Sequence, residues 1–157
     1  MKEKILEAFR DLGFKLEEEE GMGYCFKYEG LNLLYMYNEN DEEFLNIALP
    51  GIIDVEEDRM LQICALLEKI NSTLKYVKTY MLGNSVWLFY EREIIGEEDL
   101  TTVISRMILH LEAGLVFAQK AMAEIEETMA NDSSDDDTAE SAEEIVAENI
   151  ADDEDNE

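Results

Sequence analysis

Polar and apolar residues alternate along three early segments of the chain, and this two-residue period predicts β-strands. The segments cover residues 23–29, 31–37 and 43–49. Short polar links join them, which favours an antiparallel meander. We expect Pro50 and Gly51 to end the third strand, because proline has no backbone N–H group to donate to a strand ladder.

Residues 75–91, KYVKTYMLGNSVWLFYE, predict a β-hairpin around Gly83–Asn84. A two-residue Gly-Asn loop suits a type II′ turn, whose twist matches that of paired strands. In the first of its strands, Tyr76, Lys78 and Tyr80 follow the period of two and would share one face. That pattern predicts a half-exposed surface that could receive a peptide or a partner protein.

The second strand of this hairpin is apolar on both faces, which marks a central strand or a covered edge. Its aromatic residues alternate with aliphatic ones in the order VWLFY. Because aromatic side chains favour strands and buried cores, we expect Trp87 and Phe89 to fill a core between the sheet and a helix.

Three segments space their apolar residues three and four apart, which predicts helices. The first covers residues 2–12. The second would begin after Asp54, placed as an N-cap in a capping box, and run to about Ser72. The third would run from Glu97 to about Ala130, with Gly114 in its middle, where a glycine permits a bend or a close crossing.

The third helix carries a second apolar stripe, opposite the one that would face the sheet. A helix that lies on a sheet should be polar on that side. We expect the stripe to meet a partner protein or a second copy of the chain, and contact with another part of its own domain stays open. Its members, at i, i+4, i+7 and i+8, are Leu109, Ala113, Val116 and Phe117.

The predicted order of elements is helix, three-stranded antiparallel meander, helix, β-hairpin and long C-terminal helix. This is an α+β fold, and residues 1–130 would form one domain. Residues 131–157 carry 13 acidic residues and no Lys or Arg, with few apolar residues. Such a composition buries too little to offset the entropy of ordering, so we expect an acidic disordered tail.

The chain has 39 acidic and 12 basic residues, a net charge of −27, and 26 of the acids lie within residues 1–130. A surface this negative repels phosphate backbones and anionic lipid, so we expect neither nucleic acid nor membrane as a partner. No apolar run reaches the roughly 18 residues that a membrane span needs. An acidic protein could still imitate nucleic acid and sequester a basic partner.

Candidate catalytic chemistry is sparse. The one histidine, His110, falls on the second face of the third helix, where a surface or interface position is the simpler interpretation. Cys25 and Cys64 are far apart, and we expect two buried reduced thiols in a cytoplasmic protein. We find no phosphate-binding loop, dinucleotide fingerprint or metal-site spacing. We therefore expect no enzyme activity, no cofactor and no metal.

Two stretches carry a resemblance to known families, LLEKINSTLKYVKTYMLGNSVWLFYE at 66–91 and IIGEEDLTTVISRMILHL at 94–111. A helix that ends in Ile70–Asn71 leads into the hairpin, then into a short acidic link and the last helix. With the acidic body, this order resembles the fold of type III secretion chaperones and the YbjN family of proposed bacterial regulators. The resemblance implies protein binding, often through homodimers, and no enzyme chemistry.

From these observations we expect a non-catalytic protein-binding module, chaperone-like or regulatory, that forms a homodimer. The alternative is an acidic mimic or sequestering factor that uses residues 131–157 to hold a basic partner protein. The identity of a partner is not encoded in any motif that we recognise.

Overall fold

The computed structural model describes the backbone of residues 1–151 and the side chains of residues 1–132. A six-stranded antiparallel sheet has the order β1-β2-β3-β4-β6-β5, so the hairpin partner β5 lies at one edge and β1 at the other. The elements are α1 (Lys2–Asp11), β1 (Glu17–Glu19), β2 (Gly23–Tyr28), β3 (Leu31–Met36), β4 (Phe44–Asp54), the 3-10 helix η1 (Glu57–Arg59), α2 (Met60–Thr73), β5 (Lys78–Leu82), β6 (Ser85–Glu93) and α3 (Leu100–Ala151). The predicted α+β fold and element order are confirmed.

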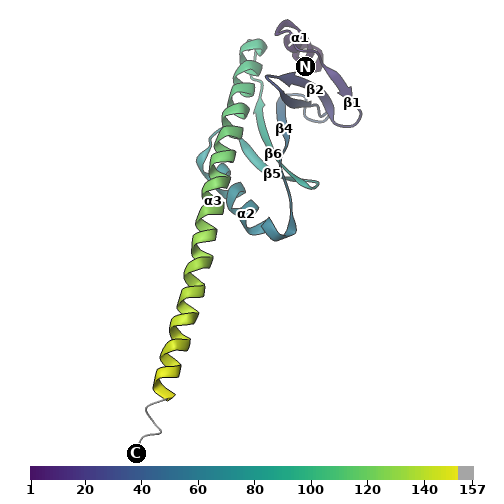
Figure 1. Cartoon of the computed structure of the whole chain (residues 1–157). Helices are drawn as coiled ribbons and strands as arrows, with labels where there is room; N and C mark the ends of the chain where they lie inside the picture. Colours follow the sequence, from purple (N-terminus) through teal and green to yellow (C-terminus); the bar gives the residue numbers. More distant parts are fainter. Residues whose placement is uncertain (152–157) are drawn as a thin grey trace, which may run out of the picture.

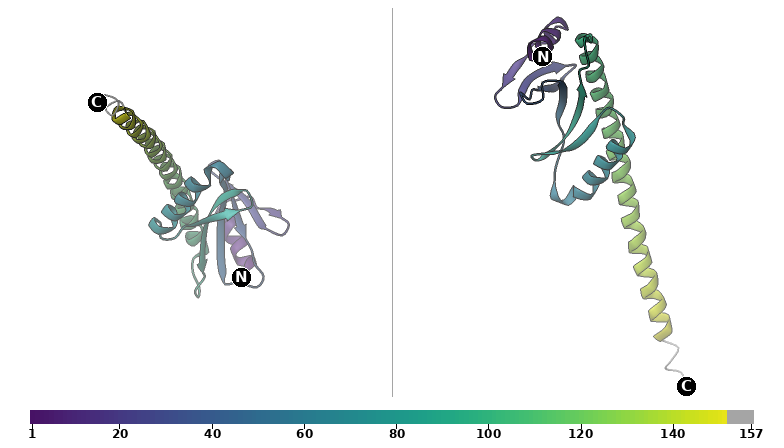
Figure 2. Two further views of the ribbon diagram at one scale, coloured as in Figure 1. Left: turned by 90° about the horizontal axis from the view of Figure 1, so that it is seen from below. Right: turned by 180° about the vertical axis from the view of Figure 1, so that it is seen from behind.

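The main core lies between one face of the sheet and the helices. Figures 1 and 2 show α3 lying along this face, with α1 near one end of the sheet and α2 beside the middle of α3. Phe9 of α1, Leu66 of α2 and Leu111 of α3 are fully buried and meet strand residues such as Leu45 and Leu88. The alternating pattern of β4 and β6 supplies these inward-facing side chains.

Gly114 allows α3 to approach the sheet closely, which is one of the two roles expected for this glycine. A Cβ atom at this position would lie 3.3 Å from Cγ1 of Val77 and 3.4 Å from Cδ1 of Leu88. These contacts are tighter than ordinary van der Waals packing. Glycine is about 1 kcal/mol less favourable than alanine inside a helix, but here it allows α3 to contact β6 and the segment before β5.

The third predicted strand does not end at Pro50–Gly51, and Asp54 does not cap a helix. Strand β4 continues to Asp54, and its pairing with β6 shifts register between Leu49 and Ile53. A bulge tolerates a residue without an N–H group, and Gly51 takes up a φ of 62° there. The following helix starts later, with η1 and then α2, and no side chain bonds to its first turn.

The acidic stretch after the first helix contains the edge strand β1. Glu17, Glu18 and Glu19 are exposed and pair with Cys25, Tyr24 and Gly23 of β2. Three consecutive glutamates give no alternation of polar and apolar residues, so the sequence does not predict this strand. A short, charged strand is also a common means of protecting a sheet edge from further pairing.

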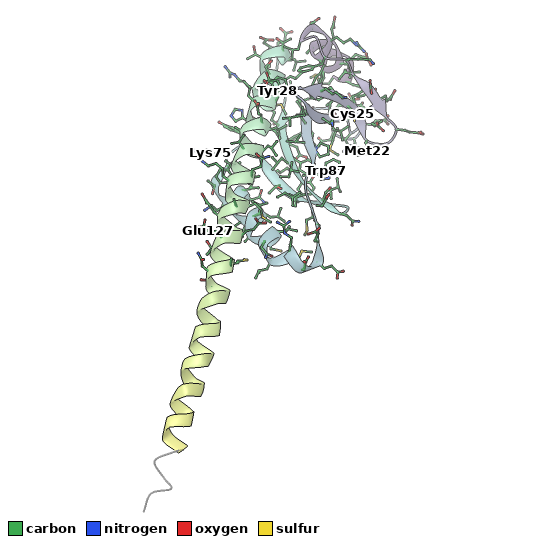
Figure 3. The ribbon with its side chains drawn as sticks, in the orientation of Figure 1. Met22, Cys25, Tyr28, Lys75, Trp87 and Glu127 are labelled. Carbon is green, nitrogen blue, oxygen red and sulfur yellow. The ribbon has the colours of Figure 1, made fainter. Side chains whose placement is uncertain are left out.

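The prediction that Trp87 and Phe89 face the helices is wrong. They lie on the opposite, outer face of the sheet, where Phe89 is fully buried beside Leu34 and Ala48. The register explains the packing, since Leu34, Ala48 and Phe89 lie directly opposite one another on neighbouring strands. Figure 3 shows Trp87 and Cys25 on the side of the sheet away from α3.

Neither cysteine is fully buried, contrary to expectation. Cys25 lies half-buried at the margin of this outer cluster, and Cys64 is exposed on α2. Burial raises the pKa of the Cys25 thiol, with Glu19 and Glu17 adding to the effect. The thiolate that reacts with oxidants or metals is therefore disfavoured at Cys25.

Helix α3 continues to Ala151, past the end expected near Ala130. It extends far beyond the sheet and away from the rest of the chain (Figure 1). The prediction of a disordered acidic tail over residues 131–157 falls mostly on residues whose side chains, or whose structure altogether, lie outside the described part. It stays a prediction.

Candidate functional site

An apolar ridge runs along the solvent side of α3, formed by Leu109, Ala113 and Val116. We call these three residues the α3 ridge. The side chains of Leu109 and Val116 are 52% and 53% exposed, and Ala113 is exposed as well. The i, i+4, i+7 spacing places them on one face, opposite the buried Ile104, Leu111 and Ala118. Phe117, the fourth residue of the predicted stripe, is half-buried and packs against the core.

Two exposed cations flank the ridge on the same face of α3. Arg106 precedes Leu109 by three residues and Lys120 follows Val116 by four, so each lies one turn from the apolar residues. Within residues 1–132, no ion pair involves either side chain, whereas Arg59, Lys78 and Arg92 all pair with glutamates. Arg106 and Lys120 thus place two positive charges beside the apolar residues of the ridge.

A groove of about 740 Å³ opens beside the first turns of α3. Its aromatic wall consists of Tyr76, Tyr90 and His110. The ring of Tyr76 lies 5.7 Å from that of Tyr90 and 5.0 Å from that of His110, measured between centroids. His110 Nδ1 lies 2.7 Å from the backbone oxygen of Arg106, and since a carbonyl oxygen only accepts, this nitrogen donates its proton.

Most polar side chains on the other side of the groove pair with each other or with the backbone. Arg92 donates to both carboxylate oxygens of Glu98, at 2.7 and 2.5 Å, and Glu98 also accepts from the backbone N–H of Ile95. The Ile95 hydrogen bond, followed by the charge of Arg92, lowers the pKa of Glu98. Burial raises the pKa of Tyr90, which stays neutral near pH 7. Arg106 is therefore the one groove cation left without a partner among the described residues.

A smaller apolar groove lies on the other side of the ridge. Its volume is about 270 Å³, and it lies between Leu109 on α3 and Phe14 and Tyr28. Figure 3 shows Tyr28 beside α3. The ridge and its two flanking grooves thus form one continuous surface over α3 and its neighbours.

The structure does not bring Tyr76, Lys78 and Tyr80 onto one surface. Tyr76 lies before β5 begins, so it does not follow the alternation of that strand, and its ring faces Tyr90 in the groove. Tyr80 lies on the outer face, with its ring stacked 4.0 Å from that of Phe89. Lys78 forms an ion pair with Glu91. The prediction of one contact face is therefore wrong for Tyr76, whereas Lys78 and Tyr80, opposite Phe89 and Trp87, share the outer face of the sheet.

Sequence reasoning missed that Tyr76 and His110 meet. They are 34 positions apart, in a bend and on a helix, and no periodicity relates them. The available signal was weak: one histidine on an otherwise apolar helix face, with an aromatic pair in the preceding hairpin region. Only the packing of α3 on β6 brings Tyr90, Tyr76 and His110 together.

Two properties of the described residues bear on metal and membrane binding. Within that part of the chain, no group of three or more His, Cys, Asp or Glu side chains could hold a metal ion. Residues 100–132 of α3 contain an 18-residue window with a mean hydropathy of 1.4, long and apolar enough to cross a membrane by length and composition alone. One face of this helix packs on the core, and 33% of the window is buried.

No family model and no curated protein sequence match the chain. Two solved structures share its fold. YbjN from E. coli, described as "a putative transcription regulator", matches with a TM-score of 0.59 and 13% identity, over 75% of this chain and 90% of that one. An uncharacterized protein from Methanothermobacter thermautotrophicus matches with a TM-score of 0.52 and 16% identity, over 81% and 97% of the two chains.

Proposed function

The chain has a YbjN-like fold, and from that premise we propose that it is a non-catalytic protein-binding module, chaperone-like or regulatory. We further propose that it works in the cytoplasm as a homodimer. The observation that carries the proposal is the half-exposed pair Leu109 and Val116 on one face of α3. The link to type III secretion chaperones rests on the sequence resemblance alone.

Burial of these side chains by a partner would be favourable. Burying a Leu or Val fully stabilises by about 1.5–3 kcal/mol relative to full exposure, so burying the exposed halves of two side chains would contribute roughly the same free energy on each copy. A second copy would bury the same ridge twice, because a two-fold axis repeats each contact. A stable interface buries about 800 Å² on each partner, so the occupant must also cover the grooves beside the ridge.

Solution mass tests the proposal. We expect wild type to be a dimer at tens of micromolar in sedimentation equilibrium. The Leu109→Asp/Val116→Asp variant should be a monomer with an unchanged circular dichroism spectrum. As a matched control, Asn32→Asp/Asn40→Asp adds the same charge at exposed positions outside α3, and it should stay dimeric. A dimeric ridge variant, or a monomeric wild type that captures no protein, would refute the proposal.

A second candidate function rests on the charge of the chain. With 39 acids against 12 bases, it could sequester a basic protein through residues 131–157. Long-range attraction of this kind is screened beyond about 8 Å at physiological salt. We expect capture of basic proteins to fall between 0.05 and 0.5 M salt and to weaken when residues 131–157 are removed. Capture that is insensitive to both changes would exclude this function.

A further inference from the structure

We propose that the α3 ridge packs against the α3 helix of a second copy in antiparallel orientation, in the register that places Arg106 beside Glu124 of that copy. This inference rests on the proposed homodimer and names the surface of the second copy that meets the ridge. Figure 1 shows α3 in front of the sheet, with no other helix or strand across its outer side, so a second helix can lie along it.

The ridge is the middle of a longer exposed seam on α3. The residues of this seam follow one another three and four positions apart, which is the spacing by which two α-helices pack along a shared line of side chains. They are Thr102, Arg106, Leu109, Ala113, Val116, Lys120, Ala123 and Glu127, all of them exposed. At 1.5 Å per residue the seam is about 38 Å long, so a second helix with the same seam can pack against several turns of it.

Opposite charges lie unpaired at the two ends of the seam. Arg106 lies near its start, and Glu124 and Glu127 lie near its end, all three exposed. The ion pairs within residues 1–132 include none of these side chains. Eighteen residues separate Arg106 from Glu124, about 27 Å along the helix, so they cannot pair within one chain. A second copy can supply the missing partner to each.

The charges favour the antiparallel orientation. In a parallel pair, a two-fold axis along the helices brings every residue level with its own copy, so Arg106 would face Arg106 and Lys120 would face Lys120. Like charges that face each other across an interface disfavour that arrangement. In an antiparallel pair, the start of one seam meets the end of the other, and the cation there meets the two glutamates.

One antiparallel register brings these charges together. A two-fold axis that crosses the pair between residues 114 and 115 brings residue 113 level with residue 116 and residue 106 level with residue 123. Arg106 then lies within about one turn of Glu124 and Glu127 of the second copy. Lys120 comes level with Leu109 of the second copy, whose exposed side chain the methylene stem of the lysine would cover.

The two neighbouring registers, one heptad away in either direction, match the charges less well. In one of them Arg106 comes level with Val116, and residues 113–119 contain no acid. In the other, Glu112 comes level with Glu124, so that two acids face each other. The register around residues 114 and 115 brings Arg106 to an acid without making two acids of residues 102–127 level.

The same register places the second helix beside the aromatic groove. The groove is lined by Tyr76, Thr102, Arg106 and His110, among others, and residues 119–127 of the second copy come level with residues 102–110. Arg92 in this groove already pairs with Glu98. Glu124 of the second copy supplies the anion for Arg106, and the contact extends past the ridge, as a stable interface requires.

A charge swap tests the register in the full-length protein at about 0.15 M salt. Arg106→Glu should raise the dissociation constant of the dimer on the order of tenfold, because an attraction becomes a repulsion at both ends of the pair. Glu124→Arg should weaken the dimer similarly, although it makes the acidic chain less negative. The double variant Arg106→Glu/Glu124→Arg keeps the net charge and should recover most of the wild-type affinity. Sedimentation equilibrium measures all four proteins.

The recovery is specific to contact between copies, because the two positions are too far apart to meet within one chain. Matched controls place the same charge changes at exposed positions outside α3. Lys27→Glu and Glu20→Arg should each dimerise like wild type, as should their combination. Circular dichroism spectra that match wild type exclude unfolding as the cause of a weaker dimer.

The outcomes separate this inference from the proposed function. If the double variant is as weak as Arg106→Glu alone, or if Glu124→Arg dimerises at least as tightly as wild type, the register is wrong while the homodimer through the ridge stands. A monomeric wild type overturns this inference outright. If the Leu109→Asp/Val116→Asp variant stays dimeric, the ridge is not the contact, and both this inference and the proposed function fail.

Discussion

Asn71 on α2 pairs with the backbone of Thr79 at the outer edge of β5 through two hydrogen bonds. Its Nδ2 donates to the Thr79 carbonyl oxygen at 2.9 Å, and its Oδ1 accepts from the Thr79 N–H at 2.8 Å. The carboxamide thus takes the place of a neighbouring strand. Together with the charged strand β1 at the other edge, it protects the sheet from pairing with another chain.

Replacing Asn71 with alanine should therefore destabilise the fold. The change removes two hydrogen bonds and leaves the backbone groups of the buried Thr79 without partners, at a cost of about 1–3 kcal/mol. Urea unfolding at one fixed protein concentration measures the difference. Asn32→Ala on β3, an exposed asparagine without a side-chain hydrogen bond in the described part, is the control and should change stability by less than about 0.5 kcal/mol. Equal unfolding midpoints for the two variants would contradict this role.

Gly114 offers a second test of packing. In Gly114→Val, the added carbons meet Val77 and Leu88, which already lie 3.3 and 3.4 Å from where a Cβ would be. Overpacking of this kind costs about 1–3 kcal/mol, more than the improved helix propensity returns. Ala123→Val, at an exposed position of the same helix, should cost under about 0.7 kcal/mol. Thermal unfolding that ranks Ala123→Val as the less stable variant would refute the close contact.

Asp99 makes the start of α3 sensitive to acid. Its carboxylate accepts hydrogen bonds from the hydroxyl groups of Thr101 and Thr102, both at 2.6 Å, and from both backbone N–H groups. The Thr101 and Thr102 side chains hold the pKa of Asp99 near 2, below its usual 3.8. A lowered pKa in the folded state stabilises above pH 3.8, and this contribution disappears as pH falls toward 2.

Comparison of wild type with Asp99→Ala isolates this effect. We expect wild type to unfold at higher urea concentration at pH 5, and the gap in midpoint to narrow between pH 4 and pH 2. Asp99→Ser, whose hydroxyl group can cap the helix without a charge, should unfold at a higher urea concentration than Asp99→Ala at every pH. A gap that does not change with pH would show that the carboxylate form has no part in the cap.

The fold was largely predictable because its signals are local. Period-two and period-3.6 patterns define β2, β3, β6 and the helices, and Gly83 with φ of 61° supports the expected turn. The predictions failed where pairing with a neighbouring strand outweighed a rule based on the local sequence. Pro50 lies inside β4 because a bulge accommodates it, and Glu17–Glu19 form a strand because β2 offers an edge.

The candidate site was predictable only in part, for a physical reason. Periodicity within α3 located Leu109, Ala113 and Val116 on its solvent face, since one helix determines that face. It could not say which face of the sheet the helices cover, so Trp87 and Phe89 were placed in the wrong layer. The meeting of Tyr76 with His110 depends on tertiary packing, which no single segment encodes.

The central claim is that the α3 ridge contacts protein, and site-specific photo-crosslinking tests it most directly. A benzoylphenylalanine in place of Val116 should, on irradiation of the full-length protein, give a covalent product with twice the mass of the chain. The same group in place of Asn32, exposed on β3 and not on α3, should give little. Equal yields at the two positions, or no product at residue 116 under conditions where wild type is dimeric, would contradict the account.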